Sequence, residues 1–171
     1  KARKRGSEVF VAIYKDTLVH IVAGHTTAIE RIRELIKDYD DAKIQDVPVA
    51  VGLHSALMDV VATQLRSNLE KVDTNQLVVP CVSGITGELL RSPDQVKQEL
   101  VSHINQPVHW ARVIAMLNDY DLIIEIGPGT SLTDALKAHY PNKKMMAINK
   151  QADIDELKKL LVPTAEEKPN G

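Results

Sequence analysis

The chain has 171 residues, enough for one domain of ordinary size or two small ones. Apolar residues make up 44% and aromatic residues only 4%, so a core must be built mainly from aliphatic side chains. A formal net charge of −2 and the lack of an apolar run of membrane-spanning length argue against nucleic-acid-binding and membrane-spanning proteins. The only cysteine, Cys81, excludes an internal disulfide and suits the reducing cytoplasm. Because Cys81 lies in an apolar segment, we expect it to be buried and unreactive.

The first fifty residues have the pattern of two strands, a helix and a third strand. Residues 9–14 (Val-Phe-Val-Ala-Ile-Tyr) and residues 18–23 are strand-forming runs separated by a Lys-Asp-Thr turn. Thr27 and Glu30 have the spacing of a capping box and predict the start of a helix. Residues 43–53 predict a further strand. This β-β-α-β order is typical of about half of a ferredoxin-like unit.

From residue 54 onward, helices and strands alternate at longer intervals. A helix is predicted at residues 54–71, three more are predicted to begin at Pro93, at Pro107 and at about Ser131, and a last one is predicted to end at Leu161. Strands are predicted at 77–82, 121–126 and 144–148, and the strand at 121–126 is predicted to be buried. Ser92, Pro93 and Gln95 form a capped helix start, and Asp153 with Glu156 predicts a second one.

This organisation predicts an α/β protein with two subdomains. Residues 1–53 form the smaller subdomain and residues 54–162 the larger one, followed by a frayed tail at 163–171. We interpret residues 1–5 as the end of a helix that precedes the first strand.

A histidine stands where a predicted strand meets a predicted helix. His54 follows the strand-forming residues 49–53 and comes directly before an amphipathic helix. In α/β proteins, chemistry is concentrated at the carboxyl ends of strands and at helix N-termini. The positive end of a helix dipole disfavours imidazolium, so we expect His54 to be neutral and able to accept a proton. The sequence contains no Gly-x-Ser-x-Gly motif to supply a nucleophile, so we expect this chain to hold only part of a catalytic site.

Five motifs follow one another in a distinctive order. They are the hairpin at residues 9–24, Gly-Leu-His-Ser-Ala-Leu-Met at 52–58, Val-Pro-Cys-Val-Ser-Gly-Ile-Thr-Gly at 79–87, Gln-Pro-Val-His-Trp at 106–110 and Ile-Glu-Ile-Gly-Pro-Gly-Thr-Ser-Leu at 124–132. In this order they resemble the C-terminal half of the malonyl-CoA:acyl carrier protein transacylases, the acyltransferases of fatty acid and polyketide synthesis. The resemblance implies part of a hydrolase-like α/β acyltransferase core plus part of a ferredoxin-like small subdomain.

The resemblance also implies a reaction and assigns residues to it. In this family a malonyl or related acyl group passes from coenzyme A to the phosphopantetheine thiol of an acyl carrier protein through an acyl-serine intermediate. His54 matches the histidine that accepts the serine proton, and His103 matches the residue whose backbone carbonyl orients that imidazole. Leu53 matches a residue of the acyl pocket that is usually phenylalanine or serine, so strict malonyl specificity is not expected.

The nucleophilic serine and the oxyanion donors of the family belong to an N-terminal segment without counterpart in this sequence. We therefore expect the chain alone to be nearly inactive and to need a serine-bearing segment as partner, besides acyl carrier protein and an acyl-CoA substrate. We expect no metal and no tightly bound cofactor. Arg5-Gly6 imitates the family's carboxylate-binding arginine, but the match would require deleting a strand and a helix, so Arg5 is not assigned to the substrate.

Two alternative functions fit the same residues. The chain could be a non-catalytic carrier-protein-binding module derived from an acyltransferase. It could also be an acyl-thioester hydrolase, for which Leu53 would leave a roomier pocket.

Two glycine-containing turns imitate other catalytic motifs. Residues 24–28 (Gly-His-Thr-Thr-Ala) are placed like a nucleophile elbow, but an unactivated threonine is a poor nucleophile, so we expect a helix cap. Residues 127–129 (Gly-Pro-Gly) lack the lysine of a phosphate-binding loop and predict a tight turn. The remaining histidines do not have metal-ligand spacing; they are His20, His25, His103, His109 and His139.

Overall fold

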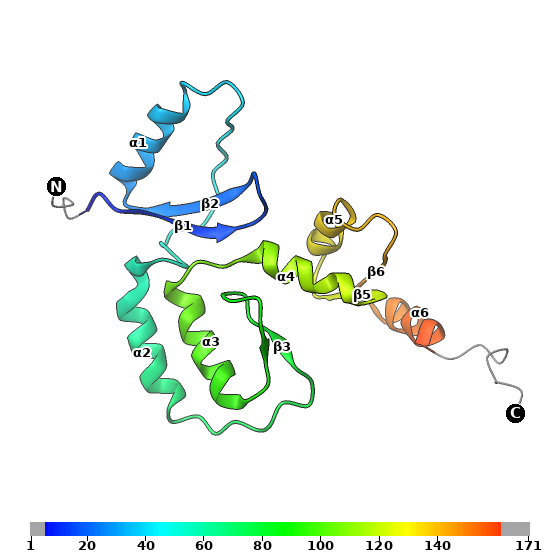
Figure 1. The fold of residues 1–171 in the computed structure, drawn as a ribbon. Coiled ribbons are helices and arrows are strands. Elements are labelled where there is room, and N and C mark those ends of the chain that lie inside the picture. The colour runs from blue at the N-terminus through cyan, green and yellow to red at the C-terminus, as the bar shows by residue number, and fades with distance from the viewer. Residues whose placement is uncertain (1–5, 162–171) are drawn as a thin grey trace, which may run out of the picture. The chain divides into compact units, whose positions relative to one another are not determined.

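The computed structural model describes residues 6–161 (Figure 1). The predicted helix end at 1–5 and the predicted tail at 163–171 lie outside the described residues. Contacts divide the chain between Met116 and Leu117 into two compact units. The predicted subdomain boundary after residue 53 falls inside the first unit and stays a prediction. Within residues 6–161, no helix has both the length and the apolar composition to cross a bilayer.

The first unit begins with the predicted hairpin and helix. Strands β1 (Val9–Tyr14) and β2 (His20–Gly24) pair antiparallel, and helix α1 (Thr26–Ile36) follows at once (Figure 1). The predicted capping box at α1 is wrong, because the N-cap is His25, two residues before Thr27, and it makes no side-chain cap bond. The Thr27 hydroxyl instead donates to the Gly6 carbonyl at 3.2 Å.

The predicted strand at residues 43–53 is absent, since these residues form no strand in the structure. Val47, Val49 and Val51 are each about half exposed, at 48%, 56% and 56%. A strand needs a partner for its backbone groups and a surface for its apolar face, and this segment has neither. The β-β-α-β prediction therefore holds only for its first three elements.

Two packed helices form the other part of the first unit. The short 3₁₀ helix η1 (Ala56–Met58) leads into α2 (Asp59–Leu69), which packs against α3 (Pro93–Asn105) (Figure 1). The capping box predicted for α3 is confirmed: the Ser92 hydroxyl accepts from the Gln95 N–H, and the Gln95 side chain accepts from the Ser92 N–H.

Helix α4 (Trp110–Met116) begins three residues later than predicted. The delay has a clear cause, because Val108 is used by the hairpin. Its N–H donates to the Ala12 carbonyl and its carbonyl accepts from the Tyr14 N–H, both at 2.8 Å. The segment between α3 and α4 is thereby fixed to β1.

The predicted strand at 77–82 is reduced to β3 (Cys81–Val82), which pairs antiparallel with β4 (Leu89–Leu90). Val78 is 98% exposed and Val79 is 71% exposed, so the apolar run before β3 has no covering surface. The prediction that Cys81 is buried is wrong for the same reason: its thiol is exposed.

The second unit alternates strands and helices as predicted. Strand β5 (Leu122–Ile126), helix α5 (Ser131–Lys137), strand β6 (Lys144–Ile148) and helix α6 (Gln151–Leu161) follow the short 3₁₀ helix η2 (Leu117–Asp119). Strands β5 and β6 are parallel and paired along their whole length.

Strand β5 is not the buried strand that the sequence predicts. Ile126 is 85% exposed and Ile124 is 37% exposed. Within residues 6–161, β5 pairs with β6 alone. Parallel sheets are normally covered on both faces, so the apolar sequence of β5 is typical of a strand inside a larger sheet.

Carboxylates cap both helices of the second unit. The Glu125 carboxylate accepts from the N–H groups of Leu132 and Thr133, at 3.0 and 2.8 Å, at the start of α5. The Asp153 carboxylate accepts from the N–H groups of Asn149 and Lys150. Since α6 begins at Gln151, Asp153 caps the helix from inside its first turn. The predicted start of α6 at Asp153 is therefore two residues late.

Candidate active site

His54 lies in a tight turn just before η1, not at the end of a strand as predicted. Its φ of +60° places it in the left-handed region, and it is the only non-glycine residue with positive φ within residues 6–161. Histidine is among the few residue types enriched in this region, but the conformation still carries strain. Strained backbone persists only where the surroundings enforce it, so the contacts that hold His54 are informative.

Two hydrogen bonds tie His54 to the C-terminal end of α3. Its backbone N–H donates to the Ile104 carbonyl at 3.0 Å. Its ring Nδ1 lies 2.5 Å from the His103 carbonyl oxygen. The contact between His54 and the His103 backbone that the resemblance implied is therefore present in the structure, while the catalytic role of these two residues stays a prediction.

The next residue closes the turn around His54. Ser55 is only 2% exposed. Its hydroxyl donates to the Gly52 carbonyl at 2.6 Å and accepts from the Leu57 N–H at 3.4 Å. A polar side chain with both bonds made inside a turn rigidifies it, so Ser55 holds the backbone on both sides of His54.

The two carbonyls that bind His54 are available because the residues after α3 do not donate to them. In an α-helix the His103 carbonyl would accept from the residue four positions later, which is Pro107 and has no N–H. The Ile104 carbonyl would accept from Val108, whose N–H instead donates to Ala12. Both acceptors are therefore left without helical partners, and His54 takes both.

The hydrogen bond defines which ring nitrogen of His54 is basic. A carbonyl only accepts, so Nδ1 must carry the hydrogen, and in the neutral imidazole Nε2 keeps its lone pair. Burial lowers the pKa of His54 from 6.5, the His103 carbonyl opposes this by raising it, and the charge of the His103 ring lowers it again. The expected neutral imidazole is supported, and burial is the largest cause of its lowered pKa.

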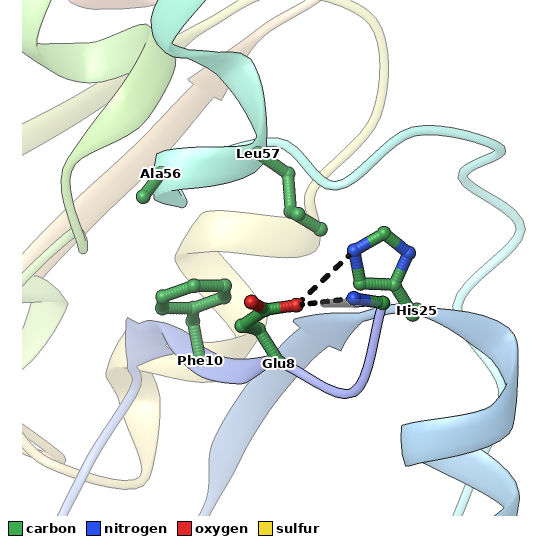
Figure 2. A pocket seen from close by; sticks show the side chains of 6 residues that line it. Glu8, Phe10, His25, Ala56 and Leu57 are labelled. Carbon is green, nitrogen blue, oxygen red and sulfur yellow. Dashed lines mark hydrogen bonds and ion pairs between the residues drawn. The ribbon is translucent and has the colours of Figure 1, made fainter. Parts of the chain in front are cut away.

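Leu53 precedes His54 and is partly buried. The structure contains a hollow beside η1, lined by Gly6, Glu8, Phe10, His25, Ala56 and Leu57. Figure 2 shows the Ala56 and Leu57 side chains facing Phe10 and the Glu8–His25 ion pair, in which His25 Nε2 and Glu8 Oε2 are 3.4 Å apart. Neither Leu53 nor His54 lines this hollow, so it is not the acyl pocket that the resemblance implied for Leu53.

Two residues connected to His103 were not predicted from the sequence. Ser83 is 1% exposed, and its hydroxyl donates to the Glu99 carboxylate at 2.6 Å. Glu99 stands one helical turn before His103 on α3, with a carboxylate oxygen 3.5 Å from the His103 ring. The i,i+4 spacing of Glu99 and His103 was visible in the sequence, but the contact with Ser83 was not.

Two of the other histidines, His20 and His109, pack against Tyr14. The rings of Tyr14 and His109 stack with centroids 4.6 Å apart, and His20 meets the same tyrosine edge-on. Over the part of the chain that the structure describes, no three His, Cys, Asp or Glu side chains are grouped to hold a metal ion.

Comparisons with curated proteins and with solved structures find malonyl transacylases. No family model matches the chain. The malonyl CoA-acyl carrier protein transacylase of Escherichia coli K12 is 28% identical over 131 residues, which are 75% of this chain and 42% of that protein. The acyl carrier protein S-malonyltransferase of Vibrio cholerae superposes with a TM-score of 0.80 at 25% identity, covering 90% of this chain and 51% of that one.

A third relative is a solved complex. The structure of a type II PKS acyl carrier protein bound to its malonyl-transacylase contains a chain that superposes with a TM-score of 0.81 at 25% identity. That match covers 91% of this chain and 51% of that one. The chain resembles the malonyl-CoA:acyl carrier protein transacylases.

The likeness to these transacylases confirms the predicted fold class, a partial α/β acyltransferase fold. The chain spans 42% of the length of the Escherichia coli transacylase and about half of the two structures.

The left-handed backbone of His54 makes a stability prediction. Replacing His54 with glycine or alanine removes the same ring contact, but only glycine adopts a φ of +60° without cost. We expect His54→Gly to be more stable than His54→Ala by about 1 kcal/mol in urea unfolding. Equal stability of the two variants would show that position 54 is not held in the left-handed region.

The lowered pKa of His54 makes a prediction about pH. Because the folded pKa lies below 6.5, the unfolded chain binds the proton more readily. The stability that neutral His54 contributes is fully present above the pKa of His54 in the unfolded chain. It is lost as the pH falls from there through the pKa of His54 in the folded chain. Between about pH 7 and about pH 5, the free energy of unfolding should fall less in His54→Gln than in the wild type.

His109, whose pKa burial also lowers, contributes part of the dependence that remains in His54→Gln. An unchanged pH dependence in His54→Gln would contradict the burial of its imidazole.

Proposed function

We propose that this chain supplies the proton-transfer part of a malonyl-CoA:acyl carrier protein transacylase. The observation that carries the proposal is the His54 imidazole, held by its Nδ1 against the His103 carbonyl at 2.5 Å, in a fold shared with those transacylases. The nucleophilic serine comes from a segment outside this sequence. The substrates are an acyl-CoA thioester and the phosphopantetheine thiol of an acyl carrier protein, and no tightly bound cofactor takes part.

In the first half-reaction, His54 Nε2 accepts the proton of the serine hydroxyl as the serine oxygen attacks the thioester carbonyl. The carbon–sulfur bond breaks, the coenzyme A sulfur takes the proton from Nε2 and leaves as a thiol, and an acyl-serine ester remains. In the second half-reaction, the carrier-protein thiol gives its proton to Nε2 and attacks the ester. The ester carbon–oxygen bond then breaks, the acyl group stays on the carrier-protein sulfur as a thioester, and His54 returns the proton to the serine oxygen, which restores the free serine.

The His103 carbonyl has the orienting role that a carboxylate has in a Ser-His-Asp triad. It accepts the Nδ1 hydrogen and so keeps Nε2 free for the substrate. Unlike a carboxylate, it adds no full negative charge beside the imidazole. Since only the main chain is used, the side chain at position 103 can vary without loss of this role.

Leu53 has a proposed role in choosing the acyl group. A leucine in place of a phenylalanine leaves more room in an acyl pocket, which favours a broader range of acyl groups than malonyl alone. A reconstituted transacylase that contains this chain should therefore be tested with acetyl as well as malonyl thioesters.

The experiment is reconstitution with a serine-bearing segment. This chain is joined to the N-terminal part of the Escherichia coli transacylase and given radiolabelled malonyl-CoA and acyl carrier protein. We expect the label to form an ester on the added segment and to pass to the carrier protein. His54→Ala should lower the transfer rate by about 10²–10⁴-fold, the usual contribution of general acid–base catalysis.

His139→Ala is the matched control, since His139 is exposed and distant in sequence from the site, and it should keep the wild-type rate. A stable label on this chain itself would contradict the proposal, as would a wild-type rate in His54→Ala. Carrier-protein binding without transfer would favour a non-catalytic module, and release of free malonate would favour a hydrolase; either result also overturns the transacylase proposal.

A further inference from the structure

We propose that Glu99 is a positioning residue for His54. Its carboxylate binds the turn at residues 83–87 to α3 and thereby holds the helix end whose carbonyls orient the imidazole. The catalytic meaning of this inference rests on the proposed function, whereas the contacts that carry it do not.

Both carboxylate oxygens of Glu99 are occupied by the turn. Oε2 accepts from the Ser83 hydroxyl at 2.6 Å, and Oε1 accepts from the N–H groups of Gly84 and Ile85, at 2.8 and 3.3 Å. The Glu99 side chain is only 15% exposed. Charge-assisted hydrogen bonds are about twice as strong as neutral ones, so three of them to one partly buried carboxylate make a firm attachment.

The turn is rigid on its own side as well. The Ser83 hydroxyl donates to Glu99 and also accepts from the N–H groups of Ile85 and Thr86, at 3.1 and 2.9 Å. The Ser83 N–H donates to the Glu88 carbonyl at 2.8 Å, and the Gly87 N–H donates to the Ser83 carbonyl at 3.0 Å. A buried serine with every hydrogen-bonding group used fixes the turn as one body.

This rigid turn holds the chain on both sides of Pro107. Before the proline it is bound to α3 through Glu99. After the proline, the Gly84 carbonyl accepts from the His109 N–H at 2.7 Å. The bend that leaves the His103 carbonyl without a helical donor is therefore clamped from both ends by the same five-residue turn.

The His103 side chain fits between the turn and the imidazole. A Cβ built on Gly84 would overlap the His103 ring, so the ring lies directly against the turn. The His103 and His54 rings meet edge-on, with centroids 5.5 Å apart and planes at 77°. Glu99 does not touch His54, and its influence passes through the turn and the helix end.

The test is nuclear magnetic resonance of the full chain labelled with ¹⁵N-histidine. In the wild type we expect a slowly exchanging Nδ1 proton on His54. In Glu99→Gln, the side-chain NH₂ group replaces one carboxylate oxygen and faces another donor, either the Ser83 hydroxyl or the Gly84 N–H. The attachment of the turn to α3 is therefore weaker. We expect at least a tenfold faster exchange of that proton, with the far-ultraviolet circular dichroism unchanged.

Three further variants make the result decisive. Ser83→Ala removes one donor of the clamp and should speed the exchange in the same direction. Asp94→Asn removes the same charge from an exposed position of the same helix and should leave the exchange unchanged. His103→Gln keeps the backbone carbonyl and should also keep the slow exchange.

A protected Nδ1 proton in both Glu99→Gln and Ser83→Ala would overturn the proposal. So would a loss in His103→Gln as large as in Glu99→Gln, since the effect would then run through the two side chains and not through the turn. These readouts need no acyl transfer. Failure of the reconstituted transfer would leave them intact, and their failure would leave the transfer intact.

Discussion

The candidate site depends on one hydrogen bond, from the His54 imidazole to the backbone carbonyl of His103. Pro107 makes that bond possible, because it has no N–H to fill the acceptor four residues before it. Val108 donates its own N–H to Ala12 in β1, which leaves the Ile104 carbonyl for the His54 backbone. The missing donor at Pro107 and the diverted donor at Val108 therefore leave two free carbonyls, and these two carbonyls bind His54.

Holding His54 in this position strains its backbone, and the surrounding contacts offset that strain. His54 is held at a φ of +60°, in a turn that Ser55 closes with a buried hydroxyl. Strain of this kind is of the order of 1–3 kcal/mol and is found where a side chain must be aimed. The proposed clamp by Glu99 and Ser83 belongs to the same arrangement, since it keeps the helix end and the following segment in register with the strained turn.

The sequence predicted best those features that neighbouring residues determine together. The hairpin, the Ser92 capping box and the positions of strands β5 and β6 have local signals, and all three are confirmed. The segments at 43–53 and 77–82 and the burial of Cys81 and β5 were predicted wrongly. Their apolar patterns require covering surfaces that the described residues do not provide. Glu99 was missed because its partners come from a turn 14 to 16 residues away in sequence, as the Ser83 and Ile85 contacts show.

The central claim is that the His103 carbonyl fixes the imidazole of His54 with its hydrogen on Nδ1. The most direct measurement is the ring tautomer of His54 in the wild-type chain, read from the ¹⁵N shifts of the two ring nitrogens above its pKa. The account predicts a protonated Nδ1 and an unprotonated Nε2. A hydrogen on Nε2, or rapid exchange between the two tautomers, would contradict it.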